Sequence, residues 1–320
     1  MRGKHSPNAR AWARKWTGQR LATAMLTASL LWGEGAASMQ QPPAGEELAE
    51  HVEFVNRFHA VRNIRLGERG QPVVVVDKAP EGHTQVHTLQ RWRRNDFPED
   101  AKFAASDLVI FRAGPMKSTG ILVDEPADPG AVSSHQMWLP ALRKIRRLSE
   151  PDPRERWSGS GFTLGDIYSR RPQDERYEVL GTETFAGCLG SLEVDAASHR
   201  HAAGAPSPDC SVDGRLVYRV AAVPVGRAQG YERRVIWVDA ETFADYRSEF
   251  YVGDTLVKTL DKSWRSMQLD DPRAQVWRYW YARTHEDGHE SIAYVPAEAV
   301  AWNVDLPASL WSTRTLRKIR

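Results

Sequence analysis

The sequence lacks the local signatures of several common enzyme classes. It has no Gly-x-Ser-x-Gly nucleophile elbow and no Gly-x-x-x-x-Gly-Lys loop for phosphate. The letters His-Glu-x-x-His occur at residues 285–289, but the Asp287-Gly288 pair inside them predicts a hairpin turn rather than a zinc-binding helix. No enzyme class is indicated, although a hydrolase whose catalytic residues lie far apart in the chain stays open.

Long apolar runs are also scarce. The run nearest the N-terminus covers residues 21–32, which is too short to span the hydrocarbon of a bilayer comfortably. Six basic residues precede it, and Ala36, Ala37 and Ser38 follow it with the small side chains of a cleavage site. Residues 1–38 are therefore expected to be a secretory signal peptide, cleaved near Ser38, which places the remaining chain in the periplasm. A retained N-terminal anchor is the alternative.

Neither sign of charge is in large excess once this leader is removed. The whole chain carries 43 basic and 41 acidic side chains, and the leader holds six of the basic and one of the acidic ones. Residues 39–320 then keep 37 basic and 40 acidic side chains, a formal net charge of −3. This balance gives no case for nucleic-acid binding.

Cysteine is limited to Cys188 and Cys210. Neither follows the leader directly, so a lipid-modified N-terminus is not expected. Both lie in the exported part, where oxidising conditions permit a disulfide, and two free thiols are the alternative. The segment between them is rich in Gly, Ala, Ser, Pro and His, which predicts a long surface loop inserted at about residues 188–212. Closing this loop at its base is worth on the order of 3 kcal/mol.

Short apolar segments separated by turn residues make up most of the remaining chain. Residues 46–63 place apolar side chains three and four apart, which predicts an amphipathic helix. A short helix is predicted to begin at Thr163, which has the capping-box spacing to Asp166, and to end before Pro172. Strands forming one long antiparallel meander are predicted at residues 73–76, 84–92, 108–111, 120–123, 136–139, 177–183, 215–223, 233–239, 246–252, 256–260, 276–284 and 291–295.

The strand predicted at residues 276–284 is rich in large apolar side chains. Strict alternation puts Trp277, Tyr279 and Tyr281 on one face and Trp280 on the other, so both faces are apolar. A sheet that keeps aromatic side chains behind covering helices can enclose a ligand cavity. Ordinary sandwich packing explains the same pattern.

Residues 137–167 combine three unlike features in a row. An apolar stretch that includes Trp138 is followed by a basic run at residues 143–147, and then by a Gly-Ser turn that leads into the helix at Thr163. This order resembles the diagnostic segment of the LolA-like family of outer-membrane lipoprotein-sorting proteins. The chain departs from the family pattern at Trp157, where Phe is usual, and at Gly161, where an acidic residue is usual.

Three further segments resemble the same family. Residues 111–126 resemble its strand pair, residues 231–258 its hairpin region and residues 306–316 its closing motif. The resemblance implies an α+β fold of mostly antiparallel β structure, in which residues 39–320 form a single domain. This domain would be an incomplete, half-open β-barrel covered by short helices, as in LolA and LolB. The resemblance also implies a carrier of a lipid-like ligand, with no catalysis, no cofactor and no metal.

The resemblance further implies that the acyl chain of a lipid or lipoprotein binds inside the half-open barrel. An inner-membrane transporter of the RND type is the implied protein partner. The residues expected to line the cavity or its mouth are Trp138, Leu139, Leu142, Arg143, Arg147, Phe162, Trp237, Phe250, Trp277 and Tyr279. An envelope interaction module, whose sheet is filled by its own side chains and transports nothing, is the alternative.

Two groups of charged or metal-binding residues allow more than one interpretation. The basic run at residues 143–147 can attract an anionic headgroup or an acidic partner, or can be a solvated strand end. His199 and His201, near Asp195 and Asp209, have side chains that bind metals, but a flexible loop gives them no fixed geometry. A solvated loop is the default interpretation there.

Overall fold

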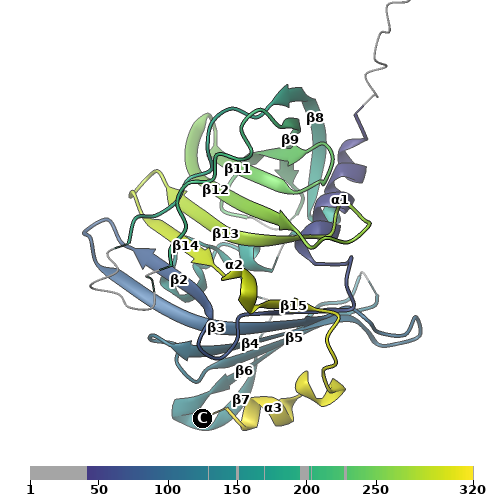
Figure 1. Cartoon of the computed structure of the whole chain (residues 1–320), viewed down its shortest axis with the longest axis vertical. Helices are drawn as coiled ribbons and strands as arrows, with labels where there is room; N and C mark the ends of the chain where they lie inside the picture. Colours follow the sequence, from purple (N-terminus) through teal and green to yellow (C-terminus); the bar gives the residue numbers. More distant parts are fainter. Residues whose placement is uncertain are drawn as a thin grey trace, which may run out of the picture. The chain divides into compact units, whose positions relative to one another are not determined.

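The computed structural model describes residues 42–128, 130–148, 151–168, 170–194, 202, 204–226 and 229–319. These residues form one large, curved antiparallel sheet with a few short helices (Figure 1). The expected signal peptide, residues 1–38, lies outside the described residues. Within the described part, no helix is both long and apolar enough to cross a membrane.

The sheet consists of two meanders, which corrects the prediction of one long meander. The first contains β2 (Val73–Lys78), β3 (Thr84–Arg94), β4 (Phe103–Ala113), β5 (Gly120–Pro126), β6 (Ser134–Leu139) and β7 (Lys144–Leu148). The second contains β8 (Glu175–Thr184), β9 (Leu216–Pro224), β10 (Arg233–Asp239), β11 (Asp245–Val252), β12 (Thr255–Ser266), β13 (Gln275–Thr284) and β14 (Glu290–Tyr294). They join where β2 pairs with β14, because the last long strand returns to the first.

The ends of the sheet remain open. The order of strands runs from β7 at one end, through the β2–β14 junction, to β8 at the other, and the described residues contain no β7–β8 pairing. Two short strands lie off this path, since β1 (Asn63–Leu66) pairs with both β3 and β15 (Val300–Trp302). The expected mostly antiparallel, half-open barrel is confirmed.

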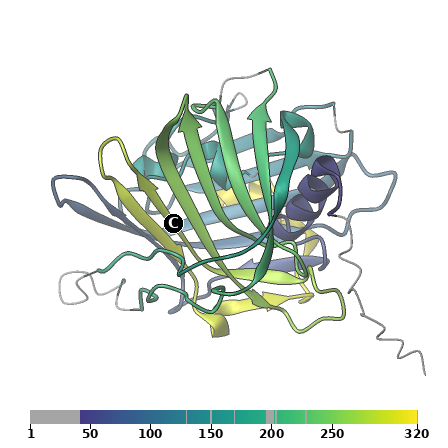
Figure 2. The same cartoon turned by 90° about the horizontal axis from the view of Figure 1, so that it is seen from above.

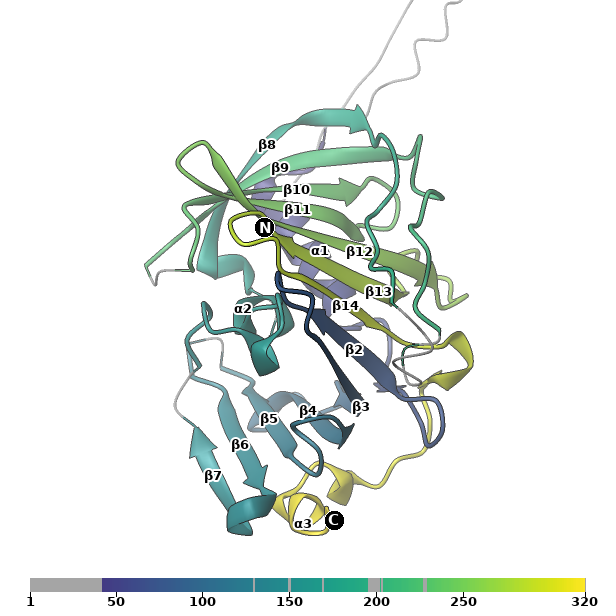
Figure 3. The same ribbon diagram turned by 90° about the vertical axis from the view of Figure 1, so that its left-hand side faces the viewer.

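Two helices lie on the concave face of the sheet, and a third packs on the outer face. The α-helices are α1 (Gly45–Asn56), α2 (Leu164–Ile167) and α3 (Thr313–Arg317). Short 3-10 turns lie at η1 (Pro140–Leu142), η2 (Trp157–Gly159), η3 (Pro172–Asp174), η5 (Ala297–Ala299) and η6 (Ala308–Leu310). Figure 2 shows α1 against the strands of the second meander, and Figure 3 shows α2 between the two halves of the sheet.

The first helix is shorter than predicted. It ends at Asn56 rather than at residue 63, because Phe58 adopts a positive φ of 55° that no helix can accommodate. Phe58 is nevertheless 1% exposed, so its side chain still packs into the core as the apolar spacing indicated. The capping box predicted for α2 is confirmed, since the Thr163 hydroxyl accepts the Asp166 N–H and the Asp166 carboxylate accepts the Thr163 N–H.

A β-bulge on β13 corrects the predicted alternation of its side chains. Trp264 and Ser263 are neighbours on β12, but they pair with Trp277 and Tyr279, so Arg278 is the extra residue. The bulge places Trp277 with Trp280 in the cluster on the concave face, while Tyr279 belongs to the cluster on the outer face. Trp277 and Tyr279 therefore do not share a face.

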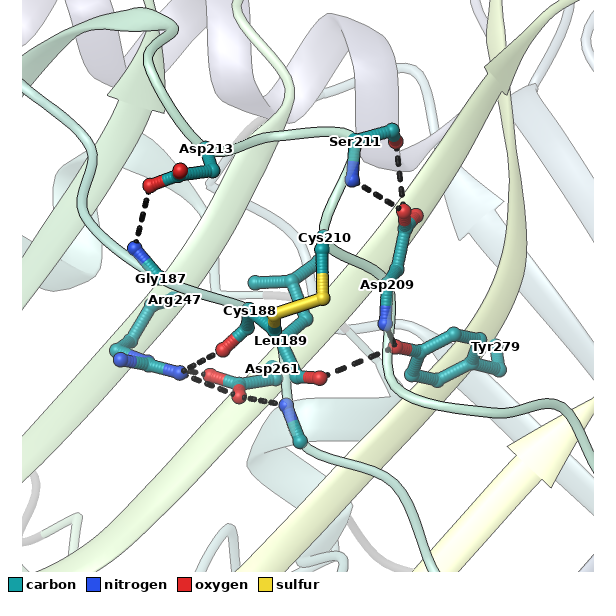
Figure 4. The surroundings of a disulfide bond; sticks show 11 residues. Gly187, Cys188, Leu189, Asp209, Cys210, Ser211, Asp213, Arg247, Asp261 and Tyr279 are labelled. Atoms are coloured by element: carbon teal, nitrogen blue, oxygen red, sulfur yellow. Dashed lines mark hydrogen bonds and ion pairs between the residues drawn. A yellow bond between two sulfur atoms is a disulfide. The ribbon is translucent and has the colours of Figure 1, made fainter.

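The predicted disulfide between Cys188 and Cys210 is present (Figure 4). The segments it joins are not a solvated loop throughout, because Leu189 and Leu192 are buried on the outer face of the second meander. The Tyr279 hydroxyl accepts the N–H of Asp209 at 2.9 Å and so attaches one of these segments to β13. His199 and His201, the candidate metal ligands, lie outside the described residues.

Candidate functional site

An apolar cavity lies on the concave face where the two meanders meet. Its volume is about 80 Å³. Its apolar walls come from both meanders, from the segment before α2 and from α2 itself. They consist of Val73, Val75, Leu89, Val109, Ile121, Val123, Trp157, Ile167, Trp277, Trp280 and Ala293. Alternate residues of paired strands face the same side, which is why neighbouring strands supply such a continuous wall. We call this space the inner cavity.

Three tryptophans, Trp157, Trp277 and Trp280, form much of the cavity wall. Trp277 and Trp280 are each 6% exposed and contact each other, with ring centroids 6.0 Å apart. Phe162 is fully buried beside Trp280 and supports it from behind. The buried indole N–H groups of Trp277 and Trp280 have no hydrogen-bond partner among the described residues. The two N–H groups are themselves inaccessible to water, so the wall they belong to is apolar.

A buried ion-pair network closes one side of the inner cavity. Arg93, with its side chain 2% exposed, donates to both oxygens of Glu125 at 2.7 and 3.2 Å. Arg57, just after α1, donates to the same carboxylate at 2.5 Å. On the neighbouring strands Arg91 and Asp107 form a two-pronged pair. This network links the end of α1 to β3, β4 and β5.

The network keeps its carboxylate charged in spite of burial. Burial opposes ionisation of Glu125, but the charges of Arg93 and Arg57 outweigh it and hold the Glu125 pKa well below its usual range. Tyr168, which follows α2, has its pKa raised to about 12 by burial and by the nearby Asp107 charge. The phenol therefore remains protonated and neutral beside the ion pairs at neutral pH.

The inner cavity adjoins a wider, more polar pocket of about 290 Å³. The residues that line both spaces are Arg57, Val123, Glu125 and Tyr168. They lie where the two spaces adjoin. We call these four residues the mouth.

A second buried pair holds α2 on the sheet. The Lys258 ammonium on β12 forms an ion pair with the Asp166 carboxylate, to which Arg170 also donates at 3.3 Å. Burial disfavours the charged carboxylate, but Lys258 and Arg170 dominate and lower the Asp166 pKa far below its usual value. Burial lowers the pKa of Lys258, and the Asp166 charge opposes this shift. Asp166 is at once a helix cap and an anchor to the sheet.

A third buried pair holds the last residue of α1. Lys262 on β12 donates to Asp245 at 2.7 Å and to the side-chain oxygen of Asn56 at 2.8 Å. Asn56 in turn donates to Asp245 at 2.9 Å, which completes a closed triangle. The Lys262 ammonium also lies 4.4 Å from the centroid of the Trp280 ring. Both helices that cover the concave face are thus fixed by buried polar contacts as well as by apolar packing.

The one Ser-His-Asp grouping that we find among the described residues does not have the geometry of a catalytic triad. Ser291 and His289 both contact the same oxygen of Asp77, at 2.5 and 2.6 Å. Ser291 is fully buried, and its hydroxyl also accepts the N–H of Gly161 at 2.8 Å. A triad needs the imidazole between the serine and the carboxylate, whereas here the carboxylate lies in the middle. This grouping ties the Gly-Ser turn to β14 and β2.

The His-Glu-x-x-His letters lie on the β13–β14 hairpin, as the turn pair predicted. His285 contacts the Thr259 hydroxyl at 2.8 Å, while His289 contacts Asp77. The two imidazoles therefore serve different partners. In the described ranges no three His, Cys, Asp or Glu side chains converge in a manner suited to a metal ion.

The residues predicted for the cavity or its mouth are distributed over three surroundings. Trp277 lines the inner cavity, and Phe162 packs against Trp280 of the cavity wall. Phe250 lies in a separate pocket beside Lys258 and Arg170. The other seven lie away from the inner cavity. Tyr279, Trp237 and Trp138 are on the outer face of the sheet, and Leu139 is at the end of β6. Leu142, Arg143 and Arg147 are exposed in the η1 turn and in β7.

Sequence reasoning did not select the charged residues of the mouth or most of the apolar wall. The apolar positions Val73 and Val75, and Ile121 and Val123, show the alternation that could have revealed a shared face. Arg91 and Arg93 show the same alternation, but charged residues at every second position ordinarily indicate a solvated face. Only the pairing of β3 with β4 and of β4 with β5 brings them to their carboxylates.

Solved structures of similar fold include three that match nearly their whole length. A putative outer membrane lipoprotein-sorting protein domain from Vibrio parahaemolyticus has 16% identity and a TM-score of 0.63, covering 86% of this chain and 98% of its own. A DUF1329 family protein from Desulfovibrio piger has 17% identity and a TM-score of 0.63, covering 85% and 99%. A LolA superfamily protein from Nitrosomonas europaea has 15% identity and a TM-score of 0.53, covering 85% and 99%.

The chain has a LolA-like fold. In addition, a family model described only as an uncharacterized protein matches residues 106–198, and no curated protein matches. The LolA-like fold accounts for the open antiparallel sheet with helices on its concave face. At these levels of identity the similarity establishes the architecture and not the ligand.

Proposed function

We propose that this protein is a periplasmic carrier that binds an acyl chain of a lipid or lipoprotein in the inner cavity. The observation that carries the proposal is the apolar wall that is shared by both meanders and completed by Trp157 and by Ile167 of α2. Two of the proteins of similar fold are described as a lipoprotein-sorting domain and a LolA superfamily protein, which supports a cargo of this kind. The LolA-like architecture gives no support to an enzymatic role.

The size of the inner cavity bears on how much cargo it holds. Its 80 Å³ has room for on the order of six water-sized spheres, far less than a complete long acyl chain requires. Each methylene that enters contributes about 0.8 kcal/mol, so six buried methylenes supply about 5 kcal/mol. We infer that a chain end occupies the inner cavity while the rest extends through the mouth into the wider pocket.

Transfer requires a recipient that binds the same cargo more tightly, since equal affinity moves nothing in one direction. We propose that the cargo passes between an inner-membrane donor, for which an RND-type exporter is the candidate, and an acceptor at the outer membrane. The expected signal peptide is the basis for placing this exchange in the periplasm.

Native mass spectrometry and fluorescence quenching test the proposal. The protein purified without detergent should carry a lipid mass that is released on unfolding. Dibrominated stearic acid should quench its tryptophan fluorescence saturably, because the bromines come close to Trp157, Trp277 and Trp280. A protein that carries no lipid and shows only the weak, non-saturable quenching of free tryptophan has a filled interior, and the interaction-module alternative then replaces the carrier.

A further inference from the structure

The end strand β7 and the C-terminal helix α3 form one surface. Leu316 and Ile319 pack on the outer face of the sheet in a cluster with Trp138 and Ile145, so α3 lies directly beside β6 and β7 (Figure 3). Two segments more than 150 positions apart in the chain thereby place their exposed side chains side by side. We call this surface the basic end, and its basic residues are Arg143, Lys144, Arg146, Arg147, Arg314, Arg317 and Lys318.

The basic end is unbalanced by any acidic residue of its own segments. All seven basic side chains are exposed, and residues 131–148 and 306–319 contain no Asp or Glu. None of the seven forms an ion pair with another described residue, whereas many basic side chains elsewhere are paired with carboxylates, Arg93 with Glu125 and Arg234 with Glu175 among them. These seven charges attract a partner because none of them is already neutralised by a neighbour.

The charge of the molecule is therefore distributed unevenly. Residues 39–320 hold 37 basic and 40 acidic side chains, and the basic end accounts for seven of the basic ones. The remainder keeps 30 basic and 40 acidic side chains, a formal charge of −10. A molecule that is positive at one end and negative elsewhere orients this end toward an anionic surface.

Apolar side chains accompany the charges. Leu142 at the η1 turn is 50% exposed, and Leu148 at the other end of β7 is 40% exposed. Pairing across β6 and β7 puts Arg147 on the face of Trp138, while Arg146 lies on the opposite face. Basic residues therefore lie on both faces of an edge strand. The charges are spread along the edge of the sheet and do not converge in a concave pocket that would enclose a single anion.

We propose that the basic end docks the protein on an anionic phospholipid surface. Exposed Leu side chains among Lys and Arg are typical of proteins that bind the membrane interface, where the charges meet headgroups and the leucines enter the acyl boundary. An edge strand with charges on both faces fits a broad surface better than the shaped acidic site of one protein. The docking brings the carrier to a membrane without using the inner cavity.

Flotation with vesicles tests this docking. The full chain should bind phosphatidylcholine vesicles that contain phosphatidylglycerol and should not bind phosphatidylcholine alone. Each basic residue close to an anionic surface contributes about 1 kcal/mol, a factor of about five. The charge reversal Arg146→Glu/Arg147→Glu, and separately Arg317→Glu/Lys318→Glu, should each weaken binding at least about 25-fold. High salt should weaken the wild-type binding as well.

The control reverses charge in the second meander, away from β7 and α3. Arg176 on β8 and Arg283 on β13 are exposed, form no ion pair with another described residue, and lie outside the basic end. Arg176→Glu/Arg283→Glu makes the same change in net charge and should bind the vesicles like wild type. Equal losses in all three variants would show that net charge alone acts, and the docking surface would be rejected.

Two further outcomes overturn the proposal in distinguishable ways. Equal binding to phosphatidylcholine alone would show that the basic residues are not needed. Binding to polyglutamate but not to anionic vesicles would assign the basic end to an acidic protein. Quenching by dibrominated stearic acid should be unchanged in every charge-reversal variant, so failure of docking and failure of the proposed carrier function are separate results.

Discussion

Filling the inner cavity by one substitution tests where the acyl chain binds. Ala293 on β14 pairs with Trp280 on β13 and with Val75 on β2, so it lies at the junction of the meanders and faces the cavity. Ala293→Leu adds three carbon atoms to this wall. They occupy space that methylenes of the cargo would otherwise take.

The magnitude follows from the displaced methylenes. Three methylenes at about 0.8 kcal/mol each amount to about 2.4 kcal/mol. Since 1.4 kcal/mol is a factor of ten, binding should weaken roughly 50-fold. The free energy of unfolding should rise or stay within about 1 kcal/mol, because the added carbons fill a space in the wall that no other side chain occupies.

Titration with dibrominated stearic acid, followed by tryptophan fluorescence, measures the affinity, and urea unfolding measures the stability. Ala301→Leu adds the same carbons on β15, outside the residues that line the inner cavity, and should change neither quantity. If Ala293→Leu folds normally and binds the fatty acid with wild-type affinity, the chain does not enter this cavity. The apolar wall is then not the binding site of the fatty acid.

Three further predictions concern the contacts that hold the fold together. Replacing Cys188 and Cys210 by Ser removes the disulfide between two residues that are 22 positions apart. The free energy of unfolding in urea should fall by about 3 kcal/mol, and the affinity for the fatty acid should not change. Lys258→Met removes one of the two cations that pair with the buried Asp166 carboxylate and leaves only Arg170. The free energy of unfolding in urea should therefore fall by about 3–5 kcal/mol. A loss under about 1 kcal/mol would contradict the role of this pair as an anchor of α2. Because the Asp166 pKa is depressed in the folded state, its contribution is complete above the ordinary value of 3.8 and is lost as the pH falls below it. Asp166→Asn should therefore flatten the acid side of the stability curve, and an unchanged acid limb would refute this assignment.

The strands and the cap of α2 were largely predictable, for local reasons. Gly-Asp and Asp-Gly pairs mark the hairpins, and apolar residues at every second position mark the strands between them. Thr163 and Asp166 form a capping box within one turn, which depends on no distant contact. The disulfide also followed from the presence of two cysteines in a part of the sequence that is expected to be exported.

The candidate site was much less predictable, because it depends on long-range pairing. The bulge at Arg278 moves Trp277 to the concave face, and no local signal distinguishes this strand from a regular one. Arg93 and Glu125 have the residue types of a solvated surface. Arg93 is buried and Glu125 half-buried because β3, β4 and β5 lie side by side. The basic run was visible in the sequence, but its continuation onto α3 appears only when the C-terminus packs beside β7.

The pairing of β2 with β14 makes the wall of the inner cavity depend on one of the longest-range contacts in the sheet. Val74 pairs with Tyr294, 220 positions later in the chain. Bringing such distant segments together costs more loop-closure entropy than forming a local hairpin. A chain that lacks its last strands therefore has an incomplete cavity wall, even where its hairpins have formed, because Trp277, Trp280 and Ala293 are missing from it.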